Sequence, residues 1–533
     1  MQTTTYVSTT IMQVRDVIRS VSLKINKFLN KEKLAFIVAF LAFIFLITLN
    51  DADYFWHLKT GEYIFTRHAL PAGDIFSYTR LGNPWVLHEW LFEVVLYAMF
   101  AWLGAVGVKL FTISIAMSAL AIMHVFLKRI SVPSAFAFFL ILAAIVPLSV
   151  GISPRPQLVS YVFFSFFLYV FLSHKYFQES QLLPTLPFIM VVWVNAHGAY
   201  VVGIALAGLF AACEWASYWI KGERSKEKRQ GLLRLTLAAI ATSLASLANP
   251  EFARHWLYPF QVMGLDATRL IAEWQSPNFH DWQPRVFLML VLALFFSYIY
   301  AARKPDLTEL IVPSLFTFTG FMASRHVPLA VLTIVPFIGI GLSRGTTRNF
   351  FFLWQRMSLS RFYKKWIGGG KQLGQGEHLL NWIVLLAIGC GLALYYPVFH
   401  AKDDATLNAT LPIKAADFVL ENHITGKMFN YYDEGGYLIY RLGPDRKVFI
   451  DGRADLYGDQ FLGDFIDIYF GHASWKEKFD RLAIDYVICG KDAAIRQLLL
   501  AEGSFRDAYI DESHAVLLRN IPKNRSLLIA SGK

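Results

Sequence analysis

The apolar run LAFIVAFLAFIFLITL at residues 34–49 is followed directly by NDADYFWH at residues 50–57. The run is apolar enough to predict a membrane span. The polar segment then places two carboxylates, Asp51 and Asp53, together with His57 where that helix would leave the bilayer. Charged groups at this depth are costly unless they face water, a partner or a substrate. The segment therefore predicts either a functional site at the membrane surface or a capped helix end, and taken alone it favours neither.

The composition extends the membrane prediction to most of the chain. Of the 533 residues, 55% are hydrophobic and only 17% are charged, which is too apolar for a soluble protein of this length. The net charge of +11 comes from short basic segments between apolar runs, which is typical of membrane orientation and does not indicate binding to nucleic acid. The three cysteines are far apart in the sequence and predict neither a disulfide framework nor a zinc site.

The distribution of Lys and Arg predicts the topology. Residues 1–33 are basic, so this segment should be cytoplasmic, and no cleavable signal pattern follows it. The apolar run at 88–104 could either span the membrane or lie at its outer interface. If it spans, the later basic clusters fall on the outer side of the membrane; if it lies at the interface, they fall on the cytoplasmic side. The second placement obeys the positive-inside rule. It predicts about eleven spans, near residues 34–49, 105–126, 133–151, 157–173, 182–195, 199–220, 231–248, 286–302, 308–322, 327–343 and 379–397.

The chain therefore reads as a mainly α, polytopic helical membrane protein with a small C-terminal domain. The membrane domain should cover 34–397, with its first outer loop at 50–104, and the remainder, 398–533, should form an extracytoplasmic α/β domain. In that domain charge rises and short patterns alternate. Strands are predicted at 448–450, 486–488 and 515–518, and helices near 411–421, 459–470 and 492–502.

The same topology sends the unusual polar motifs to one face of the membrane. Because it was derived from Lys and Arg clusters alone, this convergence is separate support for a functional site. The alternative is that these residues are helix caps, loop turns or interfacial anchors. The residues that meet on this face are Asp51, Asp53 and His57, then His88 and Glu89, Arg155, His197, Arg254 and Glu273 in the 249–285 loop, and Arg325 with His326.

These residue types suit transfer of a sugar from a lipid-phosphate donor. A carboxylate at the membrane surface can act as general base, and Asp53 and Asp51 are the carboxylates at the exit of the first span. His57 would share a helix face with Asp53, and His88 and Glu89 could complete the acidic site. Cationic groups can neutralise a leaving phosphate, and the candidates are Arg155, Arg325 and His326. The candidates for binding substrate are His197, Trp56, Trp85, Arg254 and Glu273.

No fixed ligand spacing marks a metal site, so neither a metal ligand nor a definite cofactor is assigned. Asp53, His88 and Glu89 nevertheless offer oxygen and nitrogen donors. A divalent cation such as Mg²⁺ or Mn²⁺ bound by these three residues stays open as an alternative.

The order of these features resembles the GT-C class of integral-membrane glycosyltransferases. Members of that class carry an acidic or Asp-x-Asp-like motif in the first outer loop, juxtamembrane helices in the same loop and often a soluble C-terminal domain. Asp51-Ala52-Asp53 stands at the corresponding place, and 88–104 looks like a juxtamembrane helix. The stretches WHLKTGE at 56–62, PWVLHEW at 84–90 and FIDGRAD at 449–455 are similar to a group of bacterial GT-C-like membrane proteins.

The resemblance implies a multi-pass enzyme of the bacterial cytoplasmic membrane. Its donor would be a polyprenyl-phosphate-linked sugar held in membrane lipid, and its acceptor a glycan, lipid or protein on the outer side. Its general base would be a first-loop Asp, Asp53 or Asp51, with Asp53 slightly favoured. Two alternatives remain. A transporter or flippase of lipid-linked sugar would use the same cations without a base, although no matching halves of the chain support it. A non-catalytic scaffold for envelope assembly would use the C-terminal domain for docking.

Overall fold

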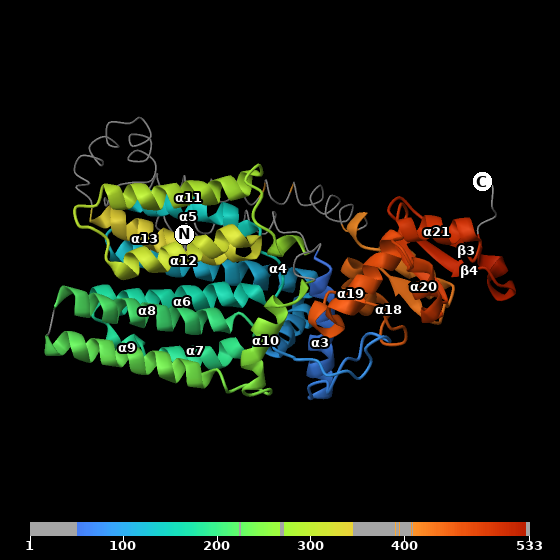
Figure 1. The fold of residues 1–533 in the computed structure, drawn as a ribbon, viewed down its shortest axis with the longest axis horizontal. Coiled ribbons are helices and arrows are strands. Elements are labelled where there is room, and N and C mark those ends of the chain that lie inside the picture. The colour runs from blue at the N-terminus through green and yellow to red at the C-terminus, as the bar shows by residue number, and fades with distance from the viewer. Residues whose placement is uncertain are drawn as a thin grey trace, which may run out of the picture.

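The computed structural model describes residues 51–222, 225–266, 271–344, 390, 394, 407 and 409–528. In these residues a long helical bundle adjoins a smaller α/β domain at one end (Figure 1). The N-terminal segment 1–33 and the predicted span 34–49 lie outside the described residues, as does nearly all of 379–397.

Apolar sequence runs form the helices of the bundle, and each span predicted between 105 and 343 falls on one of them. Five helices of the described chain are long and apolar enough to cross a membrane, and three shorter apolar helices accompany them. The chain is therefore a membrane protein. The bundle helices that follow the first outer loop are α4 (Trp90–Arg129), α5 (Ser134–Ser149), α6 (Gln157–Phe177), α7 (Thr185–Val194), α8 (Tyr200–Lys221), α9 (Lys226–Ala245), α11 (Trp282–Ile299), α12 (Leu307–Met322) and α13 (Val327–Ser343).

Helix α4 is interrupted at Gly104, whose backbone has φ 61° and ψ −150°. Glycine adopts this conformation at little cost, whereas a residue with a Cβ would be strained there. The break lies at the predicted boundary between 88–104 and 105–126, so the two segments are distinct helices joined end to end. The interfacial position of the first segment stays a prediction.

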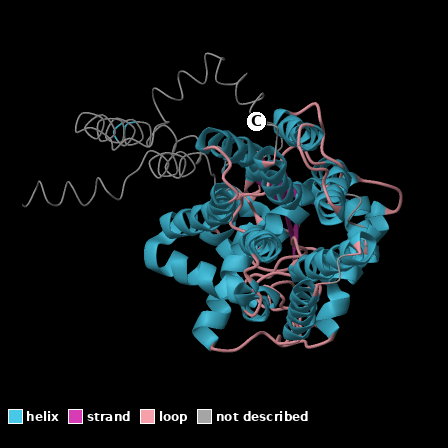
Figure 2. Ribbon diagram, turned by 90° about the vertical axis from the view of Figure 1, so that its left-hand side faces the viewer, coloured by secondary structure: helices cyan, strands magenta, loops and turns pink. Residues whose placement is uncertain are grey.

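The bundle core is built from aromatic and branched side chains. Helix α13 is buried along nearly its whole length, and it belongs to the same core cluster as the rings of Phe164, Phe171, Phe210 and Trp193. Figure 2 views the bundle from its free end, where the helices lie side by side. This close packing fixes the ends of α6, α8 and α13, which carry parts of the candidate site.

The first outer loop connects the bundle to the C-terminal domain. It begins with α3 (Asp53–Arg67), which packs against the first segment of α4. Beyond α3 the loop turns to the C-terminal domain, where Thr79 Oγ1 donates to the carbonyl of Phe449 at 2.6 Å and the Tyr78 hydroxyl donates to that of Met428 at 2.9 Å. The first outer loop therefore contacts the bundle through α3 and the C-terminal domain through Tyr78 and Thr79.

The C-terminal domain contains a four-stranded sheet in the order β1-β2-β4-β3. The central strand β2 (Tyr486–Gly490) pairs in parallel with β1 (Met428–Asn430) and antiparallel with β4 (His514–Arg519), which also pairs antiparallel with β3 (Phe505–Ile510). Helices α17 (Ile413–Glu421), α18 (Gly435–Leu442), α19 (Ala454–Phe470), α20 (Trp475–Leu482) and α21 (Ala494–Glu502) accompany it. The predicted strands at 486–488 and 515–518 and the three predicted helices are confirmed.

The predicted strand at 448–450 is wrong. Val448 makes a single bridge to Ser77 of the first outer loop and joins no sheet strand. The neighbouring Phe449 N–H donates to the Asn430 side chain at 2.9 Å instead of to a strand backbone. Residues 448–450 are apolar because they are buried under the first outer loop. The apolar pattern therefore predicted correctly that the segment is buried, and wrongly that it pairs in the sheet.

Candidate functional site

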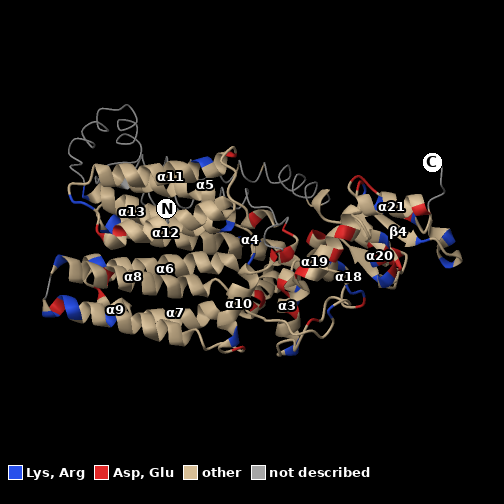
Figure 3. Ribbon diagram, viewed as in Figure 1, with Lys and Arg blue, Asp and Glu red and all other residues tan. Residues whose placement is uncertain are grey.

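A cavity of about 630 Å³ lies next to the C-terminal domain, since its lining residue Tyr258 contacts Asp455 there. It is lined by the first outer loop, the start of α6, the turn before α8, α10 (Arg254–Met263), and the short helices η3 (Ala272–Trp274) and η4 (Ser324–His326). Acidic residues gather where the bundle adjoins the C-terminal domain, whereas many Lys and Arg residues lie at the far end of the bundle (Figure 3). The polar side chains of the lining include Asp51, His88, Glu89, Arg155, Ser160, Tyr161, His197, Tyr258, Glu273, Ser324, Arg325 and His326.

Arg155 organises the two first-loop carboxylates. Its guanidinium donates to Asp51 through Nε and, at 2.7 Å, through Nη2, and Nη2 also lies 3.0 Å from Asp53 Oδ2. Asp51 in turn accepts the backbone N–H of Asp53 at 3.1 Å and so holds the start of α3. Asp51 lines the cavity, and Asp53, which accepts the Trp56 indole N–H at 3.3 Å, is not among the lining residues.

The two carboxyl groups differ in their acidity. Burial opposes ionisation of both, but the Arg155 ion pair and hydrogen bonds outweigh burial at Asp51 and lower its pKa. At Asp53 burial dominates, the negative charge of Asp51 adds to it, and the pKa rises to about 6 despite Arg155. Asp51 is therefore ionised at neutral pH, whereas Asp53 becomes protonated as the pH falls through about 6.

This difference predicts a pH dependence of stability. Because the pKa of Asp53 is raised in the folded protein, its proton favours folding: the contribution is complete below the unfolded pKa of 3.8 and is lost as pH rises through about 6. The thermal midpoint of the wild type, measured relative to Asp53→Asn, should rise as pH falls from 7 to 4. Parallel curves for the two proteins across this range would contradict the assignment.

Glu89 is surrounded by three histidines. Its Oε1 lies 3.1 Å from His88 Nε2 and 3.8 Å from His197 Nε2, and its Oε2 lies 3.6 Å from His57 Nδ1. Burial lowers the pKa of His57 to about 4 and that of His197 to about 3, so both rings are neutral at neutral pH. Burial alone would raise the pKa of Glu89 and lower that of His88, but the ion pair between them outweighs burial, so the pKa of Glu89 is lowered and that of His88 is raised. The cavity thus presents a second ionised carboxylate.

Glu273 links the two arginines of the cavity. It lies 3.3 Å from Arg325 Nη1 and 3.8 Å from Arg155 Nη1. The Arg325 guanidinium lies over the Trp274 ring, 4.3 Å from its centroid, and keeps 31% of its side chain exposed. Since Arg325 has this single acidic partner and Arg155 has three, Arg325 is the more available of the two for an anionic ligand.

Besides Asp53, four predicted site residues lie away from the cavity lining. His57 is buried behind Glu89. Trp56 and Trp85 are buried too, and their rings stack near Arg453 at 5.9 Å and 4.5 Å instead of facing the cavity. Arg254 points outward, with 80% of its side chain exposed and Glu251 as its partner at 3.7 Å.

Several residues of the site were not predicted. Tyr161 and Ser160 lie within the apolar pattern of α6, which gives no signal of function. Tyr258 lines the cavity from α10 and donates to Asp455 of the C-terminal domain at 3.0 Å. Asp455 belongs to the FIDGRAD stretch, so that stretch was a usable signal.

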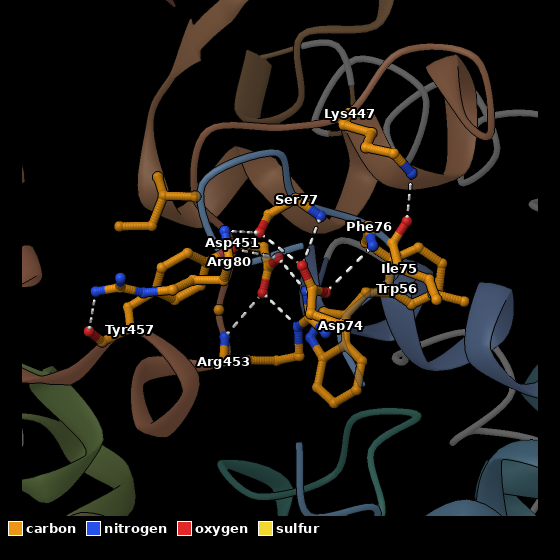
Figure 4. A network of polar contacts seen from close by, with 12 residues as sticks. Trp56, Asp74, Ile75, Phe76, Ser77, Arg80, Lys447, Asp451, Arg453 and Tyr457 are labelled. Carbon is orange, nitrogen blue, oxygen red and sulfur yellow. Dashed lines mark hydrogen bonds and ion pairs between the residues drawn. The ribbon is translucent and has the colours of Figure 1, made fainter. Parts of the chain in front are cut away.

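A buried polar network joins the first outer loop to the C-terminal domain (Figure 4). Arg453 donates to Asp451 at 2.7 and 2.6 Å and to Asp74 at 2.7 Å. Asp74 also accepts the hydroxyl and the backbone N–H of Ser77, at 2.6 and 3.0 Å. The Tyr457 hydroxyl donates to Asp451 at 2.8 Å. Arg453 and Asp451 of the FIDGRAD stretch thus form a buried structural ion pair.

The same turn touches Asp53 directly. A Cβ added to Gly452 would lie 1.9 Å from Asp53 Oδ1, so the carboxylate would have to move. We expect Gly452→Ala to lower any activity that depends on this site by up to ~100-fold, the effect of a displacement of about 1 Å. Gly463→Ala in α19, where an added Cβ meets nothing within 4 Å, is the matched control. Equal activity of the two variants would show that the position of Asp53 does not matter.

No protein-family model matches the sequence, and no curated protein matches it. Solved structures match the fold. The apo oligosaccharyltransferase of Archaeoglobus fulgidus has a TM-score of 0.56 at 12% identity, over 86% of this chain and 69% of that chain. The AglB oligosaccharyltransferase of the same organism, in complex with an inhibitory peptide and a dolichol-phosphate, has a TM-score of 0.54 with the same identity and coverage.

A third structure covers nearly all of both chains. ArnT from Cupriavidus metallidurans, bound to undecaprenyl phosphate, has a TM-score of 0.50 at 13% identity, over 93% of this chain and 98% of that chain. At such low identity the likeness concerns the fold. It agrees with the helical bundle, the first outer loop and the small α/β domain described above: this chain has the fold of the GT-C class of integral-membrane glycosyltransferases.

Proposed function

We propose that the protein is a membrane glycosyltransferase that moves a sugar from a polyprenyl-phosphate-type donor to an acceptor on the outer side of the membrane. The observation that carries the proposal is the cavity, in which ionised carboxylates and two arginines meet at the end of an apolar bundle. The fold supports it, since solved structures of this fold hold dolichol-phosphate or undecaprenyl phosphate.

Asp51 is the proposed general base. It presents an ionised carboxylate to the cavity, whereas Asp53 does not line it. In the proposed reaction an acceptor hydroxyl or amine gives its proton to Asp51 as its oxygen or nitrogen bonds to the anomeric carbon. The bond between that carbon and the donor phosphate breaks, and its electron pair stays with the phosphate. Arg155 keeps Asp51 in place and ionised.

Arg325 is the proposed partner of the leaving phosphate, with His326 beside it. Arg325 can exchange its 3.3 Å contact with Glu273 for a doubly hydrogen-bonded phosphate. His326 hydrogen-bonds the Thr319 carbonyl through Nδ1 at 3.3 Å, so its Nε2 is the other ring atom for a ligand. His197 and Glu89 are proposed to bind the sugar or the acceptor.

The proposed orientation places this cavity outside the cytoplasm. The basic groups Arg129, Lys175, Lys228 and Arg344 pair with acidic residues in a different part of the bundle, away from the cavity lining. A basic cytoplasmic end and an outer cavity follow the positive-inside rule. In Figure 3 many Lys and Arg residues lie at the end of the bundle opposite the C-terminal domain, which is the end that this orientation places in the cytoplasm.

The test is transfer of labelled sugar from a polyprenyl-phosphate donor pool by the purified protein in lipid, with acceptor extracts varied. We expect labelled acceptor to form, and Arg325→Gln to raise the donor concentration needed for half-maximal rate about tenfold or more, since it removes a charge-assisted contact. Arg254→Gln, outside the cavity lining, is the control. Movement of the labelled lipid across sealed vesicles without transfer would instead support a flippase.

A further inference from the structure

We propose that His57, Glu89 and Glu93 form a binding site for a divalent transition-metal ion, separate from Asp51 and Asp53. In the described part of the chain, this is the one group of three metal-type ligand atoms that lie within 4.8 Å of one another. It shares only Glu89 with the set of Asp53, His88 and Glu89 considered from sequence. The site lies between α3 and the first segment of α4.

The positions of the ligand atoms fit one ion. His57 Nδ1 lies 3.0 Å from Glu93 Oε1 and 3.6 Å from Glu89 Oε2. Ligands bound at roughly 2.1 Å in tetrahedral or octahedral geometry are about 3.0–3.4 Å apart. The first distance falls in this range, the second is slightly longer, and the two glutamate oxygens lie within 4.8 Å, so side-chain rotations would draw the three atoms around a shared ion.

The helices are built to bring these atoms together. Glu89 and Glu93 are four residues apart at the start of α4, so they share one face of the chain there. His57 and Gly61 share a face of α3 in the same way. A Cβ at Gly61 would lie 2.0 Å from the Glu93 carbonyl oxygen, so the missing side chain lets α3 approach α4 closely enough for His57 to reach both carboxylates.

Glu93 is a buried carboxyl group with one oxygen, Oε1, close to His57 and the other without a partner. It is 1% exposed, and its Oε2 has no hydrogen-bond partner. An unsatisfied buried polar atom is costly, and a charged one more so. The nearby Arg453 already pairs with Asp451 and Asp74. A divalent ion bound by Glu89 and Glu93 would compensate the two carboxylates in their ionised form.

The site has an entry path and a preferred class of ion. Glu89 lines the cavity, with Oε1 toward His88 and His197 and Oε2 toward His57, so an ion can enter beside it. One imidazole and two carboxylates suit Mn²⁺ or Zn²⁺ better than Ca²⁺, which prefers oxygen ligands alone. The bound ion would fasten α3, which carries Asp53, to α4.

The test is metal binding by the full-length protein, which needs no transferase activity. After chelation, Mn²⁺ is added and bound Mn²⁺ is counted by electron paramagnetic resonance. We expect one tightly bound ion in the wild type and binding weakened at least about tenfold in Glu93→Gln and His57→Asn. Glu62→Gln, an exposed acid on α3, and the double change Asp51→Asn with Asp53→Asn should bind as the wild type does.

A second measurement on the wild type covers variants that fail to fold. Electron spin echo modulation of bound Mn²⁺ should show coupling to one imidazole nitrogen. Absence of a stoichiometric ion, absence of that coupling, or unchanged binding in folded Glu93→Gln and His57→Asn would overturn the proposal. Binding lost only with Asp51 and Asp53 would overturn it too, because the ion would then lie at the first-loop aspartates.

Discussion

Asp51→Asn should lower the rate of sugar transfer by about 10³-fold while leaving the helices intact. Asparagine has the size of aspartate and keeps a side-chain oxygen for the Asp53 N–H, so the start of α3 stays in place. It cannot take up the acceptor proton, and it gives up the charged pair with Arg155. Loss of a positioned general base costs about 10²–10⁴-fold. The measurement is transfer at saturating donor, beside donor binding.

Asp53→Asn is the informative comparison for that loss. Because Asp53 does not line the cavity, we expect a smaller decrease than for Asp51→Asn. Asp281→Asn, an acid before α11 that is absent from the cavity lining, should have no effect. Full activity of Asp51→Asn would remove it as the base, and a larger loss in Asp53→Asn would exchange the two roles.

The sequence predicted the bundle well because the physical signals there are strong. Apolar runs long enough to span a bilayer gave the helices, and Gly104 marked the break in α4. The C-terminal domain was harder to predict, because a buried extended segment and a sheet strand have the same apolar pattern. The segment at 448–450 was misassigned for this reason, and the strands β1 and β3 were missed.

Membership of the cavity could be predicted only in part. Asp51, Arg155, His197 and Arg325 follow or precede apolar runs at predicted outer ends, and the structure brings them to one cavity. Their chemical roles stay predictions. Trp56 and Trp85 could not be placed, because tryptophans of the first loop serve a buried cation as well as they would serve a sugar.

Contacts between distant segments could not be predicted at all. The approach of Gly452 to Asp53 and the pairing of Arg453 with Asp74 join residues that are hundreds of positions apart. No local periodicity records such a contact. Both contacts come from the C-terminal domain and end at the first outer loop, so this domain contributes to the shape of the candidate site.

Arg453→Met is the second substitution expected to have a large effect, this time on stability. The Arg453 side chain is 1% exposed, and its removal leaves Asp74 and Asp451 buried without their cation. Breaking a buried ion pair in this way costs about 3–5 kcal/mol. We expect a lower thermal midpoint by tryptophan fluorescence and faster proteolysis of the first outer loop. Arg481→Met, which breaks the exposed pair with Glu477, is the control and should change little.

Removing the whole charged group should separate the electrostatic part of this loss from the packing part. In Arg453→Met combined with Asp74→Asn and Asp451→Asn, no buried charge lacks its partner, and the methionine still packs against Trp85. Replacing a complete buried ion-pair network is often close to neutral. Most of the stability lost in Arg453→Met should therefore return. If the triple variant is as unstable as the single one, the stacking of the guanidinium on the rings of Trp85 and Phe76 holds the two domains together, and the ion pairs do not.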